Sequence, residues 1–258
     1  MSPPSKVALV TGGGRGIGRA IAARLARDGH PVAIAGRTRA KLDAVVAAIT
    51  DAGGRAIAVE LDVCDEASVK SAFAHVTQSL GPVGVLVNNA GVIHSNLVQH
   101  TTLAAFRRVM DTNLTGAFLC TREAIPPMQA QRWGRIIHIG STGSRLGFTF
   151  ASAYCASKHA LVGLARAVAL EVAGSGVTVN VVCPGFTDTD MVAESAAKLQ
   201  VTTGQSLDEA RAQLMAMSPL GRFIAPIEVA NLVAYVASDA AAAFHGQTVS
   251  LDGGESMG

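Results

Sequence analysis

The sequence predicts an α/β protein built on one doubly wound parallel sheet of about seven strands, with helices on both faces. Short apolar runs alternate with stretches of helical periodicity along the whole chain. Glycine and proline separate several of these segments, as in Gly53-Gly54 and Gly81-Pro82. No linker, repeat or low-complexity tract divides the 258 residues, so we expect a single domain over residues 1–258.

Strands are expected where apolar residues run together, because strands of a parallel sheet are buried on both faces. These runs lie at residues 7–10, 32–35, 56–59, 85–87, 135–139, 177–182 and 248–251. The first helix has apolar residues at Ile17, Ile21 and Leu25 and stops at Asp28-Gly29. Thr38 is expected to cap a second helix, and a third is expected near residues 66–80.

The second half of the chain is expected to hold longer helices. One spans much of residues 103–131, with Pro126 and Pro127 kinking or interrupting it, and another ends near Gly174. Residues 187–220 then interrupt the strand–helix rhythm, with a break at residues 202–204. Because ligands bind beyond the carboxyl ends of parallel strands, this stretch is predicted to be an active-site lid. The alternative is a surface helical hairpin.

Composition excludes several classes of partner. The formal net charge is +2 and the arginines are scattered, so no nucleic-acid or membrane-surface binding is expected. No apolar run approaches the ~20 residues of a membrane span. The first six residues lack the apolar segment of a signal peptide, which favours a cytoplasmic protein. Cys64, Cys120, Cys155 and Cys183 form no metal-binding pattern, so free thiols and no metal are expected.

A glycine-rich turn directly follows the first strand. Gly12, Gly16 and Gly18 allow a tight turn and close approach of a pyrophosphate to a helix N-terminus, with Arg15 and Ile17 between them. At the end of the second strand, where a carboxylate would bind the ribose of NAD, the chain has Gly36-Arg37 instead. A guanidinium suits a 2′-phosphate, so Arg37, with Arg15, predicts NADP(H) as the cofactor.

Polar residues follow later strands at the same edge of the sheet. The segment Asn88-Asn89-Ala90-Gly91 suits contact with a flat cofactor, although it also fits an ordinary turn. Ser141 follows the fifth strand and is placed to bond a substrate carbonyl. Asn113, on the long helix, is expected to hold a water or a backbone kink near Lys158.

Tyr154 and Lys158 lie four residues apart and therefore on one face of a helix. A free phenol titrates near pH ~10, and a neighbouring ammonium lowers that pKa, so the pair predicts an acid/base catalyst. Taken alone, the spacing also fits a solvated helix face.

Together these motifs resemble the short-chain dehydrogenase/reductase family over essentially the full length. The matching residues are Thr11, Gly12, Gly16, Gly18, Asp62, Val63, Asn88, Asn89, Gly91, Asn113, Ser141, Tyr154, Lys158, Pro184 and Gly185. Segments 134–141 and 177–186 are most similar to 3-oxoacyl-thioester reductases and aromatic polyketide ketoreductases.

The resemblance implies a role for each residue. Tyr154 would exchange the proton with the substrate oxygen, Lys158 would bind the nicotinamide ribose, Ser141 would orient the carbonyl and Asn113 would support a proton relay. The remaining cofactor contacts implied are Asp62 and Val63 at the adenine, and Asn89, Ala90, Gly91, Pro184, Gly185 and Thr187 towards the ribose and nicotinamide. The expected substrate pocket is formed by Ile93, His94, Thr142, Leu146, Phe148, Phe150, Phe186 and Met191.

The substrate is left open at this stage. A 3-oxoacyl thioester or polyketide ketone leads, an oxidatively working secondary alcohol or 3-hydroxyacyl-CoA dehydrogenase is the alternative, and a non-catalytic dinucleotide sensor is the third reading. Relatives that use acyl carrier protein have basic residues near the entrance; Arg132 matches one, but Ser175 replaces a second arginine. The resemblance also implies a homotetramer, consistent with the general preference for closed symmetry.

Overall fold

The computed structural model describes residues 6–257, so the expectation about a signal peptide lies almost wholly outside it. The described residues form one seven-stranded sheet of order β3-β2-β1-β4-β5-β6-β7, and every pairing is parallel. The predicted doubly wound α/β class is confirmed. The strands are β1 (Val7–Thr11), β2 (Val32–Gly36), β3 (Ala56–Glu60), β4 (Val83–Asn88), β5 (Gly134–Ile139), β6 (Val177–Pro184) and β7 (Thr248–Leu251).

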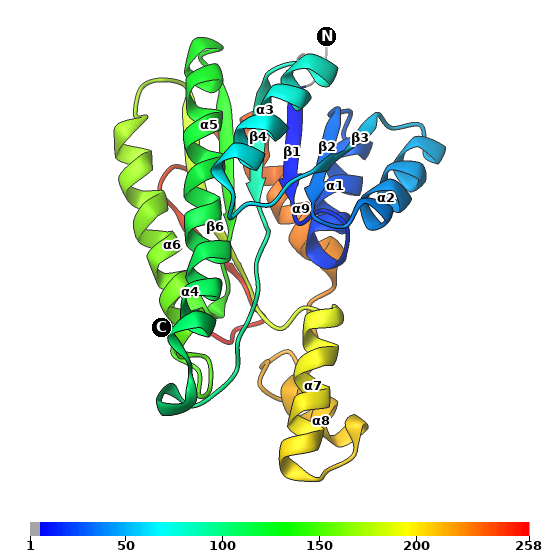
Figure 1. Ribbon diagram of the computed structural model, residues 1–258, viewed down its shortest axis with the longest axis vertical. Helices are drawn as coiled ribbons and strands as arrows, with labels where there is room; N and C mark the ends of the chain where they lie inside the picture. Colours follow the sequence, from blue (N-terminus) through cyan, green and yellow to red (C-terminus); the bar gives the residue numbers. More distant parts are fainter. Residues whose placement is uncertain (1–5, 258) are drawn as a thin grey trace.

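Helices cover both faces of this sheet (Figure 1). On one face lie α1 (Gly16–Arg27), α2 (Arg39–Asp51) and α9 (Pro226–Ala237). The other face is covered by α3 (Glu66–Leu80), α5 (Gly116–Ala130) and α6 (Ser152–Glu171). The apolar residues of the strands alternate between these two cores, with Leu9 on one side and Val10 on the other. The winding reverses between β1 and β4, which places a crevice at their carboxyl ends.

The first two helices begin and end where the sequence predicts. Ile21 and Leu25 are fully buried, and α1 ends at Arg27 with Asp28 as its C-cap. Thr38 occupies the N-cap position of α2, as expected. Its hydroxyl makes no capping hydrogen bond, so it does not cap the helix through its side chain.

The long helix differs from its prediction. It consists of α4 (Leu103–Met110), a π-helical turn (Asp111–Thr115) and α5. Pro126 and Pro127 lie within α5 without interrupting it. The irregularity lies instead at the wide turn, which holds Asn113. A π-turn inside a helix is frequent at functional sites because it redirects side chains that a regular helix would present elsewhere.

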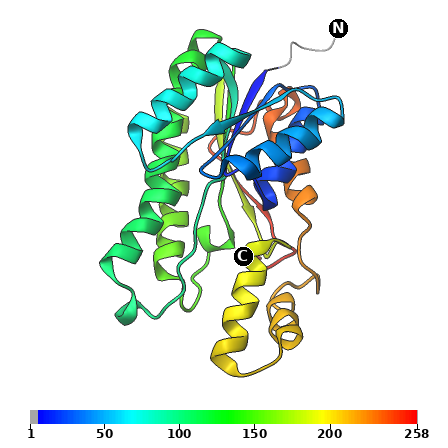
Figure 2. The same ribbon diagram turned by 45° about the vertical axis from the view of Figure 1, so that its right-hand side comes forward.

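Residues 187–220 form a helical excursion beyond the carboxyl ends of the strands (Figures 1 and 2). It contains α7 (Asp190–Thr203) and α8 (Leu207–Met215), separated at Gly204, which has a left-handed backbone. Ser206 caps α8 and exchanges hydrogen bonds with Glu209. At its base, Thr187 pairs with Ile224 in a single parallel bridge, so the excursion leaves and rejoins the body at one point.

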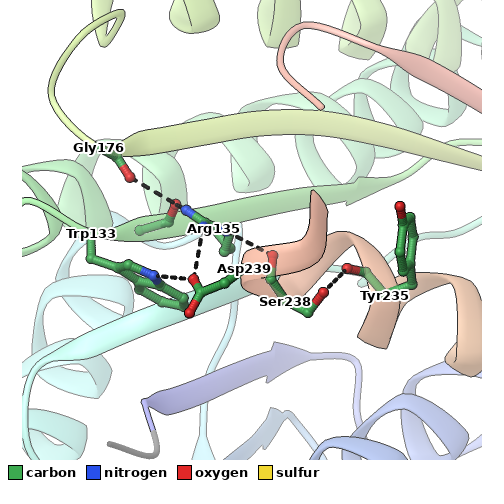
Figure 3. Close-up of polar contacts among 7 residues, drawn as sticks. Trp133, Arg135, Gly176, Tyr235, Ser238 and Asp239 are labelled. Carbon is green, nitrogen blue, oxygen red and sulfur yellow. Dashed lines mark hydrogen bonds and ion pairs between the residues drawn. The ribbon is translucent and has the colours of Figure 1, made fainter. Parts of the chain in front are cut away.

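A polar cluster lies at the amino ends of the strands, opposite the carboxyl ends that form the crevice. The Trp133 indole donates to Asp239 at 2.8 Å, and the buried Arg135 guanidinium reaches the same carboxylate at 3.2 Å (Figure 3). Arg135 also donates to the carbonyls of Gly176 and Ser238 and lies 4.5 Å from the centre of the Trp133 ring. The cluster connects the amino ends of β5 and β6 to the segment after α9, far from the crevice.

Candidate active site

A groove of about 400 Å³ follows the glycine-rich turn. Gly12 has a φ of +64°, and a Cβ on Gly18 would lie 2.4 Å from the Gly12 carbonyl oxygen, so both positions require glycine. Arg15 is the N-cap of α1 and provides no side-chain cap, and the first turn holds no acidic residue. The helix N-terminus therefore offers its N–H groups and positive dipole end to an anion.

Cationic residues surround one end of this groove. Arg37 and Lys41 line it beside Thr38, and Arg37 is exposed at the end of β2 as the sequence predicts. Lys41 is a residue that motif reasoning missed, because it falls between motifs on α2. Arg15 also lines the groove, but its guanidinium pairs with Asp190 at 3.1 Å and with Glu194 at 3.6 Å. Instead of facing a phosphate position, Arg15 contacts α7.

The segment after β3 closes the same end. Asp62, Val63 and Cys64 line the groove, as expected for the first two. The Asp62 carboxylate accepts a hydrogen bond from the Cys64 backbone at 3.0 Å, which fixes this turn. Burial raises the pKa of the Cys64 thiol, so it is not a reactive thiolate.

Asn89 has a structural role in addition to its predicted contact with the cofactor. Its side-chain amide donates to the carbonyls of Thr11 and Gly12 at 2.9 and 3.2 Å, and the Thr11 hydroxyl accepts from the backbone of Asn89 and Ala90. The segment after β4 is thereby tied to the glycine-rich turn. Both Asn89 and Ala90 line the groove together with Gly91, which lies close to Lys158 and Asn113.

Asn113 is 2% exposed and fully bonded inside the π-turn. Its carbonyl accepts from Val92 N–H at 2.8 Å, while its amide donates to the Val92 carbonyl and to the Ser157 hydroxyl, both at 3.0 Å. Ser157, another residue that sequence reasoning missed, donates in turn to the Tyr154 carbonyl at 2.7 Å. Asn113 therefore holds the loop after β4 against the helix that carries Tyr154 and Lys158.

Tyr154 and Lys158 share one face of α6, with the Lys158 Nζ 5.7 Å from the centre of the Tyr154 ring. Lys158 is 5% exposed and donates to the Ile139 carbonyl at 2.7 Å. Burial lowers the pKa of Lys158 to about 8. Ser141 lies just past β5, where its hydroxyl accepts from Gly143 N–H at 3.1 Å. All four residues expected to be catalytic thus lie at the carboxyl edge of β4 and β5.

The acidity of Tyr154 differs from the expectation. Its pKa is raised, because burial of the phenol outweighs the hydrogen bond from Ser141, which lowers it. The Lys158 ammonium, expected to lower this pKa, donates its hydrogen bond to the Ile139 carbonyl. A raised pKa keeps the phenol protonated at neutral pH.

His138 is a buried group that the sequence did not indicate. It lies on β5, fully buried, with its Nδ1 3.2 Å from the Asn88 amide nitrogen. Burial, followed by the charge of Lys158, lowers its pKa to about 3. The ring is therefore neutral at working pH, and its Nδ1 is the acceptor because Asn88 Nδ2 can only donate.

Of the expected substrate residues, Phe148 and Thr142 lie close to Tyr154. A Cβ on Gly143 would lie 3.3 Å from the Tyr154 ring and 3.5 Å from the Phe148 ring, and Thr142 is buried next to Gly143. Leu146 and Phe150 are exposed, and the loop that holds Phe150 accepts a hydrogen bond from Asn96 N–H at 2.8 Å. His94 is half-buried, and its Nε2 is a buried atom without a hydrogen-bond partner among residues 6–257.

A carboxylate from the C-terminal segment supports the base of the helical excursion. Glu255 accepts from Phe186 N–H at 3.1 Å, while the Phe186 carbonyl accepts from Ile224 N–H at 2.8 Å. Gly185 packs so tightly here that a Cβ would lie 2.5 Å from the Glu255 carboxylate. Pro184 ends β6, and the Thr187 hydroxyl donates to the Gly185 carbonyl at 3.0 Å. Met191, half-buried at the start of α7, lines the groove. No sequence motif indicated Glu255.

A glycine cradle at a helix N-terminus, beside a buried Tyr–Lys pair, defines a dinucleotide-dependent oxidoreductase. Comparison with known proteins agrees: the family described as short chain dehydrogenase matches residues 6–200. The chain belongs to this family, and its cofactor class is a nicotinamide dinucleotide, which the groove fits.

Individual relatives cover nearly the whole chain. The 3-oxoacyl-[acyl-carrier-protein] reductase FabG of Staphylococcus aureus is 39% identical over 98% of this chain and 99% of its own length. The corresponding reductase MabA of Mycobacterium tuberculosis is 40% identical over 99% of this chain and 96% of its own. A variant of the actinorhodin polyketide ketoreductase, solved with NADPH, superimposes with a TM-score of 0.95 at 38% identity, covering 97% of both chains.

Proposed function

We propose that the protein reduces a ketone to a secondary alcohol with NADPH, and that its substrate is a 3-oxoacyl thioester or a polyketide ketone. The observation that carries this proposal is the grouping of Ser141, Tyr154 and Lys158 next to the glycine-lined groove. The names of the relatives support the substrate class.

The reaction transfers a hydride to the carbonyl carbon and a proton to the carbonyl oxygen. The nicotinamide supplies the hydride. Tyr154 supplies the proton, and the hydrogen bond with Ser141 opposes the rise that burial gives to the pKa of its phenol. Ser141 donates a hydrogen bond to the same oxygen and stabilises the charge that develops there. Lys158 binds the ribose hydroxyls. Asn113 connects the π-turn to the loop after β4 and to α6 through its hydrogen bonds with Val92 and Ser157.

The preference for NADP(H) is part of the proposal. Arg37 and Lys41 place two cations at the end of β2, where Gly36-Arg37 replaces the carboxylate that would bind the ribose of NAD. Within residues 6–257 neither side chain forms an ion pair, so both are available to a 2′-phosphate.

The position of Arg132 in the fold bears on carrier-protein recognition. Arg132 precedes β5 and Ser175 precedes β6, so both lie at the amino edge of the sheet, whereas Tyr154 lies beyond the carboxyl edge. A six-residue strand spans about 20 Å, so within one chain Arg132 does not border the entrance. The pocket residues Leu146, Phe148 and Phe186 are apolar, which supports an acyl or ring portion of the substrate. A CoA thioester or a free ketone fits one chain better than a docked carrier protein.

Assembly as a homotetramer also remains a proposal. Phe118 is 43% exposed on α5 and lines an apolar groove against α6 with Leu114, Ala160 and Leu164. Leu103 and Phe106 extend this surface along α4. Light scattering at micromolar concentration tests this point, and a monomer would contradict it.

The decisive experiment measures NADPH oxidation against a panel of ketones. Acetoacetyl-CoA, acetoacetyl carrier protein and a bicyclic aromatic ketone should be compared by kcat/KM, together with the reverse reaction of 3-hydroxybutyryl-CoA and NADP⁺. Reduction of the thioester or the cyclic ketone supports the proposal. Turnover in the oxidative direction alone would support the dehydrogenase alternative, and NADPH binding without turnover would indicate a sensor.

A further inference from the structure

Arg15 joins the glycine-rich turn to the first turns of α7. Its Nη1 lies 3.1 Å from an Asp190 oxygen and 3.6 Å from a Glu194 oxygen, and these acidic residues are four apart on one helix face. The contact extends to the backbone, since a Cβ on Gly16 would lie 3.3 Å from the Thr189 methyl. The two segments are 175 residues apart in sequence.

This contact lies at the cofactor groove. Arg15, Thr189, Asp190 and Met191 line the same groove as Arg37. Of the guanidinium groups at this groove, that of Arg37 forms no ion pair within residues 6–257, while that of Arg15 already faces two carboxylates. A 2′-phosphate that pairs with Arg15 would have to displace Asp190 and Glu194 from its guanidinium.

We propose that Asp190 and Glu194 are specificity-determining residues for the dinucleotide, because they compete with its 2′-phosphate for Arg15. Binding of a phosphorylated dinucleotide transfers Arg15 from α7 to the phosphate and releases the first turn of α7. An unphosphorylated dinucleotide leaves the ion pairs in place. The inference rests on the proposed use of NADP(H), and it connects the choice of cofactor to the position of the helical excursion.

All three side chains are more than half exposed, which sets the size of the effect. Exposed pairs are weak and screened by salt, so the competition shifts affinity severalfold rather than a thousandfold. The same exposure makes the substitutions safe for folding, because no buried group loses its partner.

The test uses 2′,5′-ADP and 5′-AMP, which differ only by the 2′-phosphate, with calorimetry on the full chain at low salt. In the double variant Asp190→Asn, Glu194→Gln, the affinity for 2′,5′-ADP should rise about three- to tenfold while that for 5′-AMP stays unchanged. A matched control, Asp188→Asn with Asp208→Asn, removes two negative charges from the same excursion without touching Arg15; Asp188 pairs with Arg211 instead. The control should leave both affinities unchanged.

A second arm removes Arg15. In an Arg15→Ala background, the Asp190→Asn, Glu194→Gln changes should have no effect on 2′,5′-ADP affinity. If the control raises affinity as much as the test variant, or if the effect persists without Arg15, only long-range charge is at work and the proposal is overturned.

Hydrogen exchange gives a readout independent of affinity. Amides in residues 190–194 of the unaltered chain should exchange faster when 2′,5′-ADP is bound than when 5′-AMP is bound, and slower or equal exchange would overturn the proposal. The proposed function fails separately: if the unaltered chain binds 2′,5′-ADP no better than 5′-AMP, the NADP(H) preference is wrong. If that preference exists but does not grow in the double variant, only the competition is wrong.

Discussion

The proposed catalytic centre and the helical excursion are built in opposite ways. Asn113, Ser157 and Lys158 are buried, and their polar groups bond to one another or to backbone carbonyls. The excursion buries only Val192, Ala196 and Ala210 of its two helices and is held to the body by exposed ion pairs and a single bridge.

This difference fits the tasks that we propose for the two regions. Buried, fully bonded side chains keep one geometry, and acid/base chemistry requires that geometry because a small misplacement costs rate. Exposed pairs are weak and exchange partners easily, as a segment that adjusts to its ligand requires. Substitutions in the centre should therefore change rates and stability strongly, and substitutions around the groove and excursion should change affinities moderately.

The largest effect is expected from Tyr154→Phe. Loss of the phenol proton should reduce kcat by about 10²–10⁴ while leaving NADPH affinity unchanged. Steady-state oxidation of NADPH and calorimetry measure the two quantities. The chain contains one other tyrosine, Tyr235, which is 45% exposed on α9, so Tyr235→Phe is a matched control that should keep full activity. A kcat within tenfold of normal in Tyr154→Phe would contradict the assignment.

Next comes the pH dependence set by Lys158, whose pKa is lowered from 10.5 to about 8 by burial. Between about pH 8 and pH 10.5, Lys158 is protonated in the unfolded chain but not in the folded one. The free energy of unfolding should therefore rise with pH over this range. The slope for one proton is about 1.4 kcal/mol per pH unit. Urea denaturation from pH 7 to pH 10 measures it, and Lys158→Met should remove this part of the slope.

The same titration should appear in the kinetics. The kcat/KM for reduction should fall as pH rises through about 8, because Lys158 then loses the ammonium that binds the ribose. A profile that is flat from pH 7 to pH 9 would contradict this role.

At the edge of the groove, Arg37→Asp should weaken NADPH binding by about 10- to 100-fold, since a charge-assisted hydrogen bond contributes about 1.5–3 kcal/mol. NADH affinity should be unchanged or higher. Fluorescence titration with both nucleotides measures the change. Arg39 is two residues away but pairs with Asp43, so Arg39→Asp is the control and should leave both affinities near normal. An unchanged NADPH preference in Arg37→Asp would contradict the phosphate assignment.

The smallest effect is expected at the base of the excursion. Glu255→Ala leaves Phe186 N–H without its acceptor and should raise KM severalfold and lower stability by about 1 kcal/mol. Glu255→Gln keeps an acceptor oxygen and should restore KM, which a purely electrostatic role would not allow. The exposed Glu171→Ala is a control for loss of charge. Equal behaviour of the alanine and glutamine variants would contradict a hydrogen-bonding role.

Much of the fold was predictable, because apolar runs and helical periodicity depend on near neighbours in the chain. The strands at 7–10 and 177–182 and the buried face of Ile21 and Leu25 follow from such patterns. A backbone irregularity at Asn113 was one of the two sequence expectations, but its form, the π-turn at Asp111–Thr115, was not predictable, since Asn113 stabilises it through Val92 and Ser157 from other elements. The prolines, which the sequence marked as the break, are accommodated within α5.

By itself, the sequence determined the sheet and the glycine-rich turn and indicated the proposed acid/base residues, because each of these features lies in a short segment with its own spacing. Only the tertiary structure decided where those residues direct their side chains. Lys158 faces the Ile139 carbonyl, Arg15 pairs with acidic residues of α7 at the groove, and Glu255 supports Phe186 from 69 residues away. Contacts of this kind depend on which segments the fold brings together, and no local pattern encodes them.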